Sequence, residues 1–369
     1  MLKSCDSGSM PSFGDSAKFL AGAKCFGLNQ KCESAEYFEM QMVKSYLDKL
    51  RVSIDVPNYP QFRDMNEMFL TMIDGVEKVD SGYLETKTPS LKQDNRKIAE
   101  VATLEKNAQM IQYANSIQKS VNAPFEVRVC VTGPYTLAAL FQYRDEQIYT
   151  RLADVIAKIL EFNLFDNKYG KTSLVSVDEP LFGLMDDKFI DFGSAGRENL
   201  RNAWKTIFSA VKRKNAGTML HLHSTTDGLF WDVPSLQVID THVEDPIFTM
   251  NKTKQLLESN DKYLKASIAV NDFDKLIKAK IVADSPLKLA ETEINEKIAS
   301  SWTDIKNGRV DPELFLESVA TMKSRLAKVV ERFGADRVMY AGPECGLKGF
   351  PKYSNALECL RRVSVAVKN

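Results

Sequence analysis

All three histidines of the chain lie in one short stretch that also carries several carboxylates. His221, His223 and His242 are followed or separated by Asp240 and Glu244. Imidazole and carboxylate groups together form the ligand set of a first-row metal, or the parts of an acid–base site. Because the chain has no histidine elsewhere, this concentration favours one functional site over three unrelated structural histidines.

Apolar strands alternate with helical segments through most of the chain. Apolar runs predict strands at 125–131, 173–177, 218–223, 236–240, 263–270 and 337–341, and a shorter one at 52–56. Helical spacing of apolar residues predicts helices between these strands, and also at 33–50, 61–76 and 96–120, whereas the first 30 residues read mostly as loop. Strands that alternate with helices and are apolar on both faces indicate a parallel sheet with covered faces.

This alternation predicts an α/β fold, a (β/α)8 TIM barrel. Residues 1–369 would form a single domain, with residues 1–50 as an N-terminal extension. The rival interpretation is a doubly wound open sheet. A doubly wound sheet that binds a nucleotide typically has a glycine-rich phosphate-binding loop after its first strand. Neither GxGxxG nor GxxxxGK[ST] occurs in the chain.

Composition narrows the class of partner. Of the 369 residues 44% are apolar, and Lys+Arg and Asp+Glu each number 49, so no net charge favours nucleic acid or an anionic membrane. No apolar run reaches the roughly 18 residues of a membrane span, and the first residues lack the apolar core of a signal peptide. Six cysteines spread along the chain do not suit a disulfide framework. We expect a cytoplasmic protein with reduced thiols whose partner is a small molecule or another protein.

Polar side chains follow several of the predicted strands, where a parallel barrel places its active site. Alternate residues of a strand share a face, so His221 and His223 should point the same way, as should Asp240, His242 and Glu244. The other polar groups at strand ends are Thr132, Asp178, Glu179, Asn271, Asp272, Glu344 and Cys345.

Each of these residues also has a structural interpretation. A single histidine at a strand end is more often hydrogen-bonded than a ligand, and Asp178 and Glu179 could open a loop with an N-cap. Cys345 alone could be a small buried residue. The shared location at strand ends favours the functional interpretation for the group.

Five dispersed motifs resemble the catalytic half of cobalamin-independent methionine synthase, including the short archaeal forms that consist of that half alone. The resemblance spans nearly the whole chain, and the Asp-Glu-Pro and Pro-Glu-Cys-Gly motifs are its most specific parts. The motifs are Gly8-Ser9-Met10-Pro11, Arg63-Asp64-Met65, Val131-Thr132-Gly133-Pro134-Tyr135-Thr136-Leu137, Asp178-Glu179-Pro180 and Pro343-Glu344-Cys345-Gly346-Leu347-Lys348.

The resemblance implies a (β/α)8 barrel that uses zinc to methylate homocysteine in methionine biosynthesis. It implies that His223, Asp240 and Cys345 hold the metal and that Asp178 binds the substrate amino group. The remaining substrate-binding residues it implies are Gly8, Ser9, Gln61 and Glu179. Zinc would deprotonate the substrate thiol, whose ordinary pKa of about 8.5 keeps it protonated at neutral pH.

The chain departs from the family pattern at the metal site. Thr225 stands two residues after His223, where the family has a zinc cysteine, and Asp240 is a shorter carboxylate than the family's glutamate. Gln61 falls near the position of a family glutamate that contacts the substrate. The residues considered as replacement ligands are His221, Thr225, His242 and Glu244. An altered zinc site, a site for another divalent ion and a barrel without metal all remain open.

The leading hypothesis is a zinc-dependent methyltransferase in which Asp178 and His223 are catalytic. The methyl donor would be a methylfolate or a methylcorrinoid, free or on a corrinoid protein. One alternative is a metal-free barrel that binds a small amino acid or a pteridine. Another is a decarboxylase or lyase of the wider superfamily that uses His221, His242 and Asp178 as acid–base groups.

Overall fold

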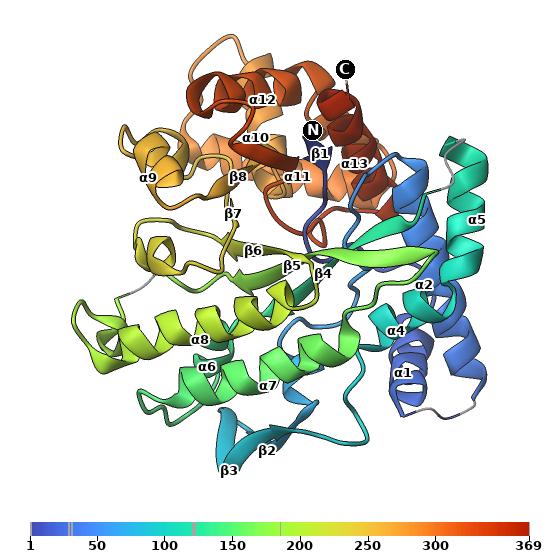
Figure 1. The fold of residues 1–369 in the computed structure, drawn as a ribbon. Helices are drawn as coiled ribbons and strands as arrows, with labels where there is room; N and C mark the ends of the chain where they lie inside the picture. Colours follow the sequence, from blue (N-terminus) through green and yellow to red (C-terminus); the bar gives the residue numbers. More distant parts are fainter. Residues whose placement is uncertain (1, 29, 31, 120–122, 185, 369) are drawn as a thin grey trace.

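A curled sheet of seven parallel strands lies at the centre of the molecule (Figure 1). The computed structural model describes residues 2–28, 30, 32–119, 123–184 and 186–368. Neighbouring strands in the sheet all run parallel. Their order is β1 (Lys3–Ser4), β9 (Val338–Pro343), β8 (Tyr263–Ala269), β7 (Val238–Asp240), β6 (Gly217–Leu222), β5 (Gly170–Glu179) and β4 (Phe125–Thr132).

Helices surround this sheet, and a separate antiparallel hairpin of β2 (Ile73–Val79) and β3 (Gly82–Leu91) projects below it (Figure 1). The helices are α1 (Ser16–Gly27), α2 (Glu33–Arg51), α3 (Glu67–Leu70), α4 (Ala99–Lys106), α5 (Ala108–Lys119), α6 (Pro134–Ala138), α7 (Ile148–Asn163), α8 (Ala195–Lys212), α9 (Thr253–Ser259), α10 (Phe273–Asp284), α11 (Glu291–Lys306), α12 (Val319–Phe333) and α13 (Tyr353–Lys368).

Helix α8 shows how sequence produces this packing. Ser194 caps it by accepting a hydrogen bond from the backbone N–H of Arg197, which satisfies a donor that the first turn leaves free. Leu200, Trp204 and Ile207 then recur at helical spacing on one face, and all three are fully buried. Burying an apolar side chain of this kind stabilises the fold by roughly 1.5–3 kcal/mol.

The segment 56–59 lies between the two edge strands of the sheet. Val56 bridges Cys5 beside β1, and Asn58 bridges Arg128 of β4, both in parallel orientation. The Val56 N–H donates to the Ser4 carbonyl at 3.0 Å, and the Tyr59 N–H donates to the Arg128 carbonyl at 3.1 Å. This segment therefore connects the two edges of the curled sheet.

The structure confirms the six strands predicted between residues 125 and 341 and corrects the prediction at the N-terminal end. Residues 61–76 do not form one helix, because only Glu67–Leu70 is helical and Ile73 already begins β2. Residues 52–56 form a single bridge instead of a strand. The first 30 residues, expected mostly as loop, contain α1, and Lys3–Ser4 pairs with β9 in the sheet.

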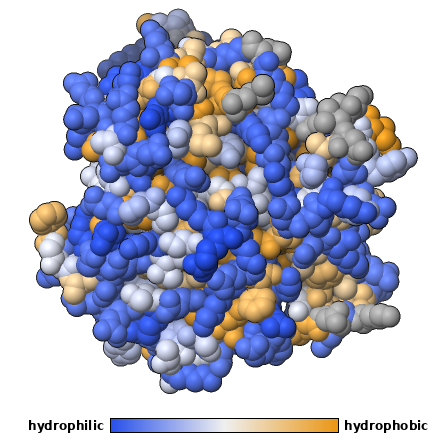
Figure 2. Space-filling model, viewed as in Figure 1, coloured by the Kyte–Doolittle hydropathy of each residue, from blue (hydrophilic) through white to orange (hydrophobic). Residues whose placement is uncertain are grey.

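The face shown in Figure 2 is mostly hydrophilic, with apolar residues in small groups. No helix among the described residues is both long enough and apolar enough to cross a membrane.

Candidate metal and substrate site

The parallel register sets four polar residues in one row at the carboxyl ends of adjacent strands. Thr132 of β4 pairs with Asp178 of β5, Asp178 with His221 of β6, and His221 with Asp240 of β7. Because these strands end together, the loops that follow them can bring further side chains to the same place.

Three imidazoles and one thiol converge just beyond this row. One possible ligand atom from each of His221, His223, His242 and Cys345 lies within 4.8 Å of the other three. The Cys345 Sγ is 3.6 Å from Nε2 of His223, and the His223 and His242 ring centroids are 4.3 Å apart. The prediction that His221 and His223 point the same way is confirmed.

Several nitrogens of this cluster have no hydrogen-bond partner. Neither ring nitrogen of His221 completes a hydrogen bond, although its Nδ1 lies 3.2 Å from Oδ2 of Asp240. The Nε2 of His242 is also unpaired, while its Nδ1 lies 3.9 Å from Glu344. Since buried polar atoms normally find a partner, these nitrogens are suited to a ligand that the cluster would hold.

The cluster favours the thiolate form of its cysteine. Burial alone would raise the pKa of Cys345, but the neighbouring His221, together with the nearby rings of His223 and His242, holds this pKa well below its usual range. Burial alone would lower the pKa of His221, but Asp240 and Cys345 outweigh it and raise the pKa to about 10. A thiolate with three imidazoles is a donor set suited to zinc.

Asp240, expected from the resemblance to be a metal ligand, lies beside the cluster as a partner of buried cations. Its Oδ1 accepts a hydrogen bond from Lys265 at 2.6 Å, and its Oδ2 lies 3.4 Å from Nη2 of Arg128. Burial opposes ionisation, but Lys265 and His221 hold the pKa of Asp240 well below its usual range. Oδ1 is therefore engaged by Lys265, and Oδ2 lies between Arg128 and the outer nitrogen of His221, 3.2 Å away.

Two further candidate ligands also lie outside the cluster. Thr225 is buried and bonds to Asp245 through both its backbone N–H, at 2.9 Å, and its hydroxyl. Glu244 has an 84% exposed side chain that lies 3.5 Å from Lys275. Neither residue is brought to the converging ligand atoms.

Glu179, expected to contact the substrate, is turned away from the cavity. It accepts hydrogen bonds from the backbone N–H groups of Tyr135 and Thr136, at 2.9 and 2.7 Å, and from Trp204 Nε1 at 3.0 Å. These contacts tie β5 to the start of α6 and to α8. Glu179 therefore joins three elements of the fold and is not among the residues that line the cavity.

A cavity of about 270 Å³ adjoins the cluster. The expected substrate residues Gly8, Ser9, Gln61 and Asp178 all line it, next to His223. The other lining residues are Ser7, Arg63, Asp64, Met65, Pro180, His221, Cys345, Gly346 and Lys348.

Two glycines allow the loop around Ser9 to close against the cluster. Gly8 has a φ of +58°, which favours glycine, and a Cβ at Gly346 would lie 2.7 Å from the backbone nitrogen of Ser9. The Ser9 carbonyl accepts the Leu347 N–H at 2.7 Å, and the Met10 N–H donates to Gln61 at 3.2 Å. The N-terminal loop is therefore fixed against the segment that carries Cys345.

Asp178 presents a carboxylate to this cavity. Its Oδ1 accepts a hydrogen bond from Ser176 at 2.6 Å, and Arg128 lies 3.9 Å away. Burial raises the pKa of Asp178, while His221, Arg128 and Ser176 act in the opposite direction. A buried carboxylate beside an open space is suited to bind an ammonium group.

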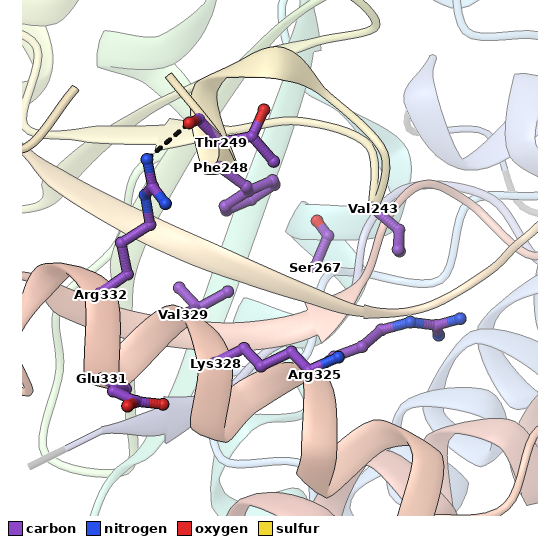
Figure 3. A pocket seen from close by; sticks show the side chains of 9 residues that line it. All are labelled: Val243, Phe248, Thr249, Ser267, Arg325, Lys328, Val329, Glu331 and Arg332. Atoms are coloured by element: carbon purple, nitrogen blue, oxygen red, sulfur yellow. Dashed lines mark hydrogen bonds between the residues drawn. The ribbon is translucent and has the colours of Figure 1, made fainter. Parts of the chain in front are cut away.

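A larger cavity, of about 530 Å³, lies against α12 (Figure 3). Its wall includes Arg325 and Arg332 and none of the candidate ligands. Arg325 is paired with Glu317 at 2.6 Å, and Arg332 donates to the Thr249 carbonyl, as the dashed line shows. We place the functional site at the smaller cavity because the reactive groups converge there.

Two buried cations that hold Asp240, Arg128 and Lys265, were not predicted from the sequence. Each is fully buried, and each interrupts an otherwise apolar strand, in FEVRVCV and YLKASIAV. A charged residue in a strand that is covered on both faces needs a buried partner. That signal was present in the sequence, although the partner could not be assigned from it.

Comparison with solved structures shows the same fold in methionine synthases at low sequence identity. A B12-independent methionine synthase from Shewanella sp. W3-18-1, in complex with selenomethionine, has a TM-score of 0.58 and 14% identity over 100% of this chain and 97% of its own. The putative vitamin B12-independent methionine synthase from Listeria monocytogenes has a TM-score of 0.53 and 14% identity over 100% and 98%. No protein-family model and no curated protein matches the chain.

Proposed function

We propose that this chain is a zinc-dependent methyltransferase that methylates the thiol of a small amino acid such as homocysteine. The observation that carries the proposal is the convergence of His221, His223, His242 and Cys345 beside a cavity that Asp178 lines. The fold shared with two methionine synthases supports the same class of reaction.

The residues present fit zinc. Zinc in proteins is bound by sulfur, nitrogen or oxygen ligands, and a catalytic site uses three protein ligands and keeps a fourth position for water or substrate, which three of the four converging donors would provide. The bond lengths place a sulfur and a nitrogen about 3.6 Å apart in a tetrahedral site. The Cys345 Sγ and the His223 Nε2 are separated by 3.6 Å. When bound, zinc supplies a centre at which a thiol loses its proton and remains nucleophilic.

The surrounding residues would bind and orient the substrate. Asp178 would hold the amino group, and Gly8 and Ser9 would close over the amino acid and exclude water. The substrate exchanges its S–H bond for an S–CH3 bond, and the thiol proton passes to the demethylated donor or to solvent. The product would be methionine. The Shewanella enzyme is in complex with selenomethionine, which is methionine with selenium in place of sulfur.

The size of the cavity bears on the methyl donor. Pockets that enclose drug-sized molecules measure about 300–1,000 Å³, so a cavity of about 270 Å³ suits an amino acid and excludes a corrinoid ring. We infer that a methylfolate or methylcorrinoid, free or on a corrinoid protein, presents its methyl group at the mouth of the cavity.

We also infer that the fold is a complete (β/α)8 barrel. The segment 56–59 pairs with Cys5 on one side and with Arg128 on the other, and would supply the eighth position between β1 and β4.

Elemental analysis of protein purified without chelator tests the metal site. We expect close to one zinc per chain, lost in Cys345→Ser and His221→Ala because each removes a converging donor, and retained in the control Cys25→Ser, whose thiol lies elsewhere. Absence of metal even after zinc is supplied would contradict the proposal and favour a metal-free binding protein or a lyase. If both variants still bound zinc, the assignment of Cys345 and His221 as ligands would be wrong.

Substrate binding is tested in the zinc-loaded protein by calorimetry. Asp178→Asn should weaken methionine binding by roughly 10–100-fold, because a charge-assisted contact to the ammonium group is lost. Binding of the analogue that lacks the amino group should change little. An equal loss for both ligands would indicate a general distortion of the cavity.

A further inference from the structure

The cluster rests on a buried network of charges that extends through the interior of the curled sheet. Its cations are Lys49, Arg128 and Lys265, and its carboxylates are Asp6, Asp178 and Asp240. Lys49 lies 2.6 Å from Asp6, and Lys265 lies 2.6 Å from Asp240, with all four side chains 0–3% exposed.

Such a network is not explained by stability alone. Removing charges from water costs several kcal/mol per ion. Replacing a buried ion pair with well-packed apolar residues therefore often leaves the stability of a protein unchanged or raises it. A buried ion pair is therefore expected where it holds another group in place, and the network ends on two functional groups. Asp240 lies 3.2 Å from the Nδ1 of His221, and Arg128 reaches Asp178 through Ser176.

We propose that the Asp240–Lys265 pair is the positioning device of the metal site. Asp240, whose Oδ2 lies 3.2 Å from Nδ1 of His221, would accept the Nδ1–H when the metal is bound and so present the opposite edge of the ring to the metal, while Lys265 prevents Asp240 from acting as a ligand itself. This inference rests on the proposed metal site. It assigns both residues a positioning role and leaves His221, His223, His242 and Cys345 as the donors.

The contacts of Asp240 support this assignment. Its Oδ1 accepts from Lys265, which is itself fixed by a second bond to the Pro343 carbonyl at 2.6 Å. Its Oδ2 faces Arg128 at 3.4 Å and the His221 ring at 3.2 Å. A metal-binding histidine generally donates its other ring N–H to a carboxylate or carbonyl, which fixes the tautomer and orientation of the ring.

A carboxylate also lies near a second histidine, at a longer distance. Glu344 lies 3.9 Å from Nδ1 of His242 and is held in turn by the backbone N–H groups of Val243, at 2.8 Å, and Asn271, at 3.0 Å. Cys345 would then be the one anionic ligand. A divalent ion with three neutral imidazoles and one thiolate keeps a net positive charge, which favours approach of a substrate thiolate.

The test compares two double variants that each remove one buried ion pair. Asp240→Asn/Lys265→Met removes the pair that contacts His221, and Asp6→Asn/Lys49→Met removes a pair at the same distance that contacts no histidine. Zinc affinity is measured by competition with a chromogenic chelator, and thermal unfolding verifies that each variant is folded.

We expect the first variant to bind zinc roughly 10–100-fold more weakly, and the control to stay within roughly 3-fold of the wild type. In the nitrogen-15 NMR spectrum of the zinc-loaded protein, the Nδ1–H signal of His221 should be lost only in the first variant. Lys265→Arg, which keeps the cation, should retain most of the affinity.

Each other outcome overturns the proposal in a recognisable way. Unchanged affinity in Asp240→Asn/Lys265→Met would show that His221 needs no positioning pair. Equal losses in both double variants would show that the network serves the fold alone. A folded wild-type chain that binds no zinc would overturn the proposed function and this inference together.

Discussion

Thr225 shows how the partner of a side chain decides its role. It occupies the position of a zinc cysteine in the family that the sequence resembles, yet its hydroxyl and N–H both bind Asp245. Asp245 also accepts hydrogen bonds from the Thr241 hydroxyl at 3.0 Å and the Ile247 N–H at 2.8 Å. Thr225 therefore fastens the loop after β6 to the loop after β7, which carries His242.

Replacing Thr225 with cysteine should not restore a second thiolate ligand. We expect Thr225→Cys to lower the free energy of unfolding by about 1–2 kcal/mol, because a buried carboxylate loses a good donor. Zinc affinity should stay within roughly 3-fold of the wild type. Denaturant unfolding and zinc competition measure the two effects. Thr225→Ser, which keeps the hydroxyl, serves as the matched control, and a tighter zinc site in Thr225→Cys would contradict the expectation.

At the residue scale the sequence predicts some ligands and not others, for a physical reason. His221 and His223 share a strand face, so their common direction follows from local geometry. The role of Asp240 depends on Lys265 and Arg128, which lie on other strands. A carboxylate with free oxygens can serve as a ligand, whereas the oxygens of one paired with buried cations are engaged elsewhere, and only the folded structure shows which description fits Asp240.

Among the elements, β7 and β8 depend on an unusual anchor. Only two residue pairs join these strands, Val238 with Tyr263 and Ile239 with Leu264. Just before β8, the buried Lys262 donates to the carbonyls of Val233 and Leu236, at 2.7 and 3.1 Å. This lysine therefore links the entry of β7, which ends at Asp240, to the entry of β8, which carries Lys265.

Lys262 should make the free energy of unfolding depend on pH in the alkaline range. Burial lowers the pKa of Lys262 from 10.5 to about 8. Between these values the unfolded chain holds the proton and the folded chain releases it, so the contribution of Lys262 to the free energy of unfolding rises with pH, by roughly 1–3 kcal/mol.

The measurement is urea unfolding from pH 7.5 to 10 for the wild type and Lys262→Met. As the pH rises, the free energy of unfolding of the wild type should increase relative to that of Lys262→Met by roughly 1–3 kcal/mol. A difference that stays constant across this range would show that Lys262 has an ordinary pKa in the fold.

Elements were predictable where burial is uniform along them. Strands β4 to β9 are apolar because helices cover the sheet, and their positions follow from that pattern. The apolar residues of 61–76 are spaced as in a helix, but the segment passes through three different environments. Gln61 lines the cavity, Met68 packs in the core and Ile73 pairs with Leu91. Tertiary contacts override the local pattern there, and α1 was missed because its sequence is rich in small residues.

For the molecule as a whole, the proposed closure of the sheet would determine whether the two halves of the site meet. The cavity joins Ser9 and Gln61, near the segment 56–59, to Cys345, which follows the last strand. Alternation of strands and helices predicted a closed parallel sheet but placed its first strand at 52–56, whereas the pairing residues are Val56 and Asn58. The bridges are too short to leave a periodic signal in the sequence.

Hydrogen exchange tests this closure. If 56–59 completes a barrel, the amides of Val56 and Tyr59, which donate to Ser4 and Arg128, open only when the sheet opens. Their protection should approach that of Val129 in the middle of β4. It should exceed that of Lys78 in the two-stranded hairpin by at least roughly 10-fold, because a hairpin alone is marginally stable.

Fast exchange at these two amides would instead indicate an open sheet. If Val56 and Tyr59 exchanged as fast as Lys78, the sheet would be open between β1 and β4, and the loop around Ser9 would not be held over the cavity. Zinc could still bind, because its four candidate ligands lie within β6 or just after β6, β7 and β9, away from the β1–β4 edge. Protection of these two amides therefore tests the substrate side of the site independently of its metal side.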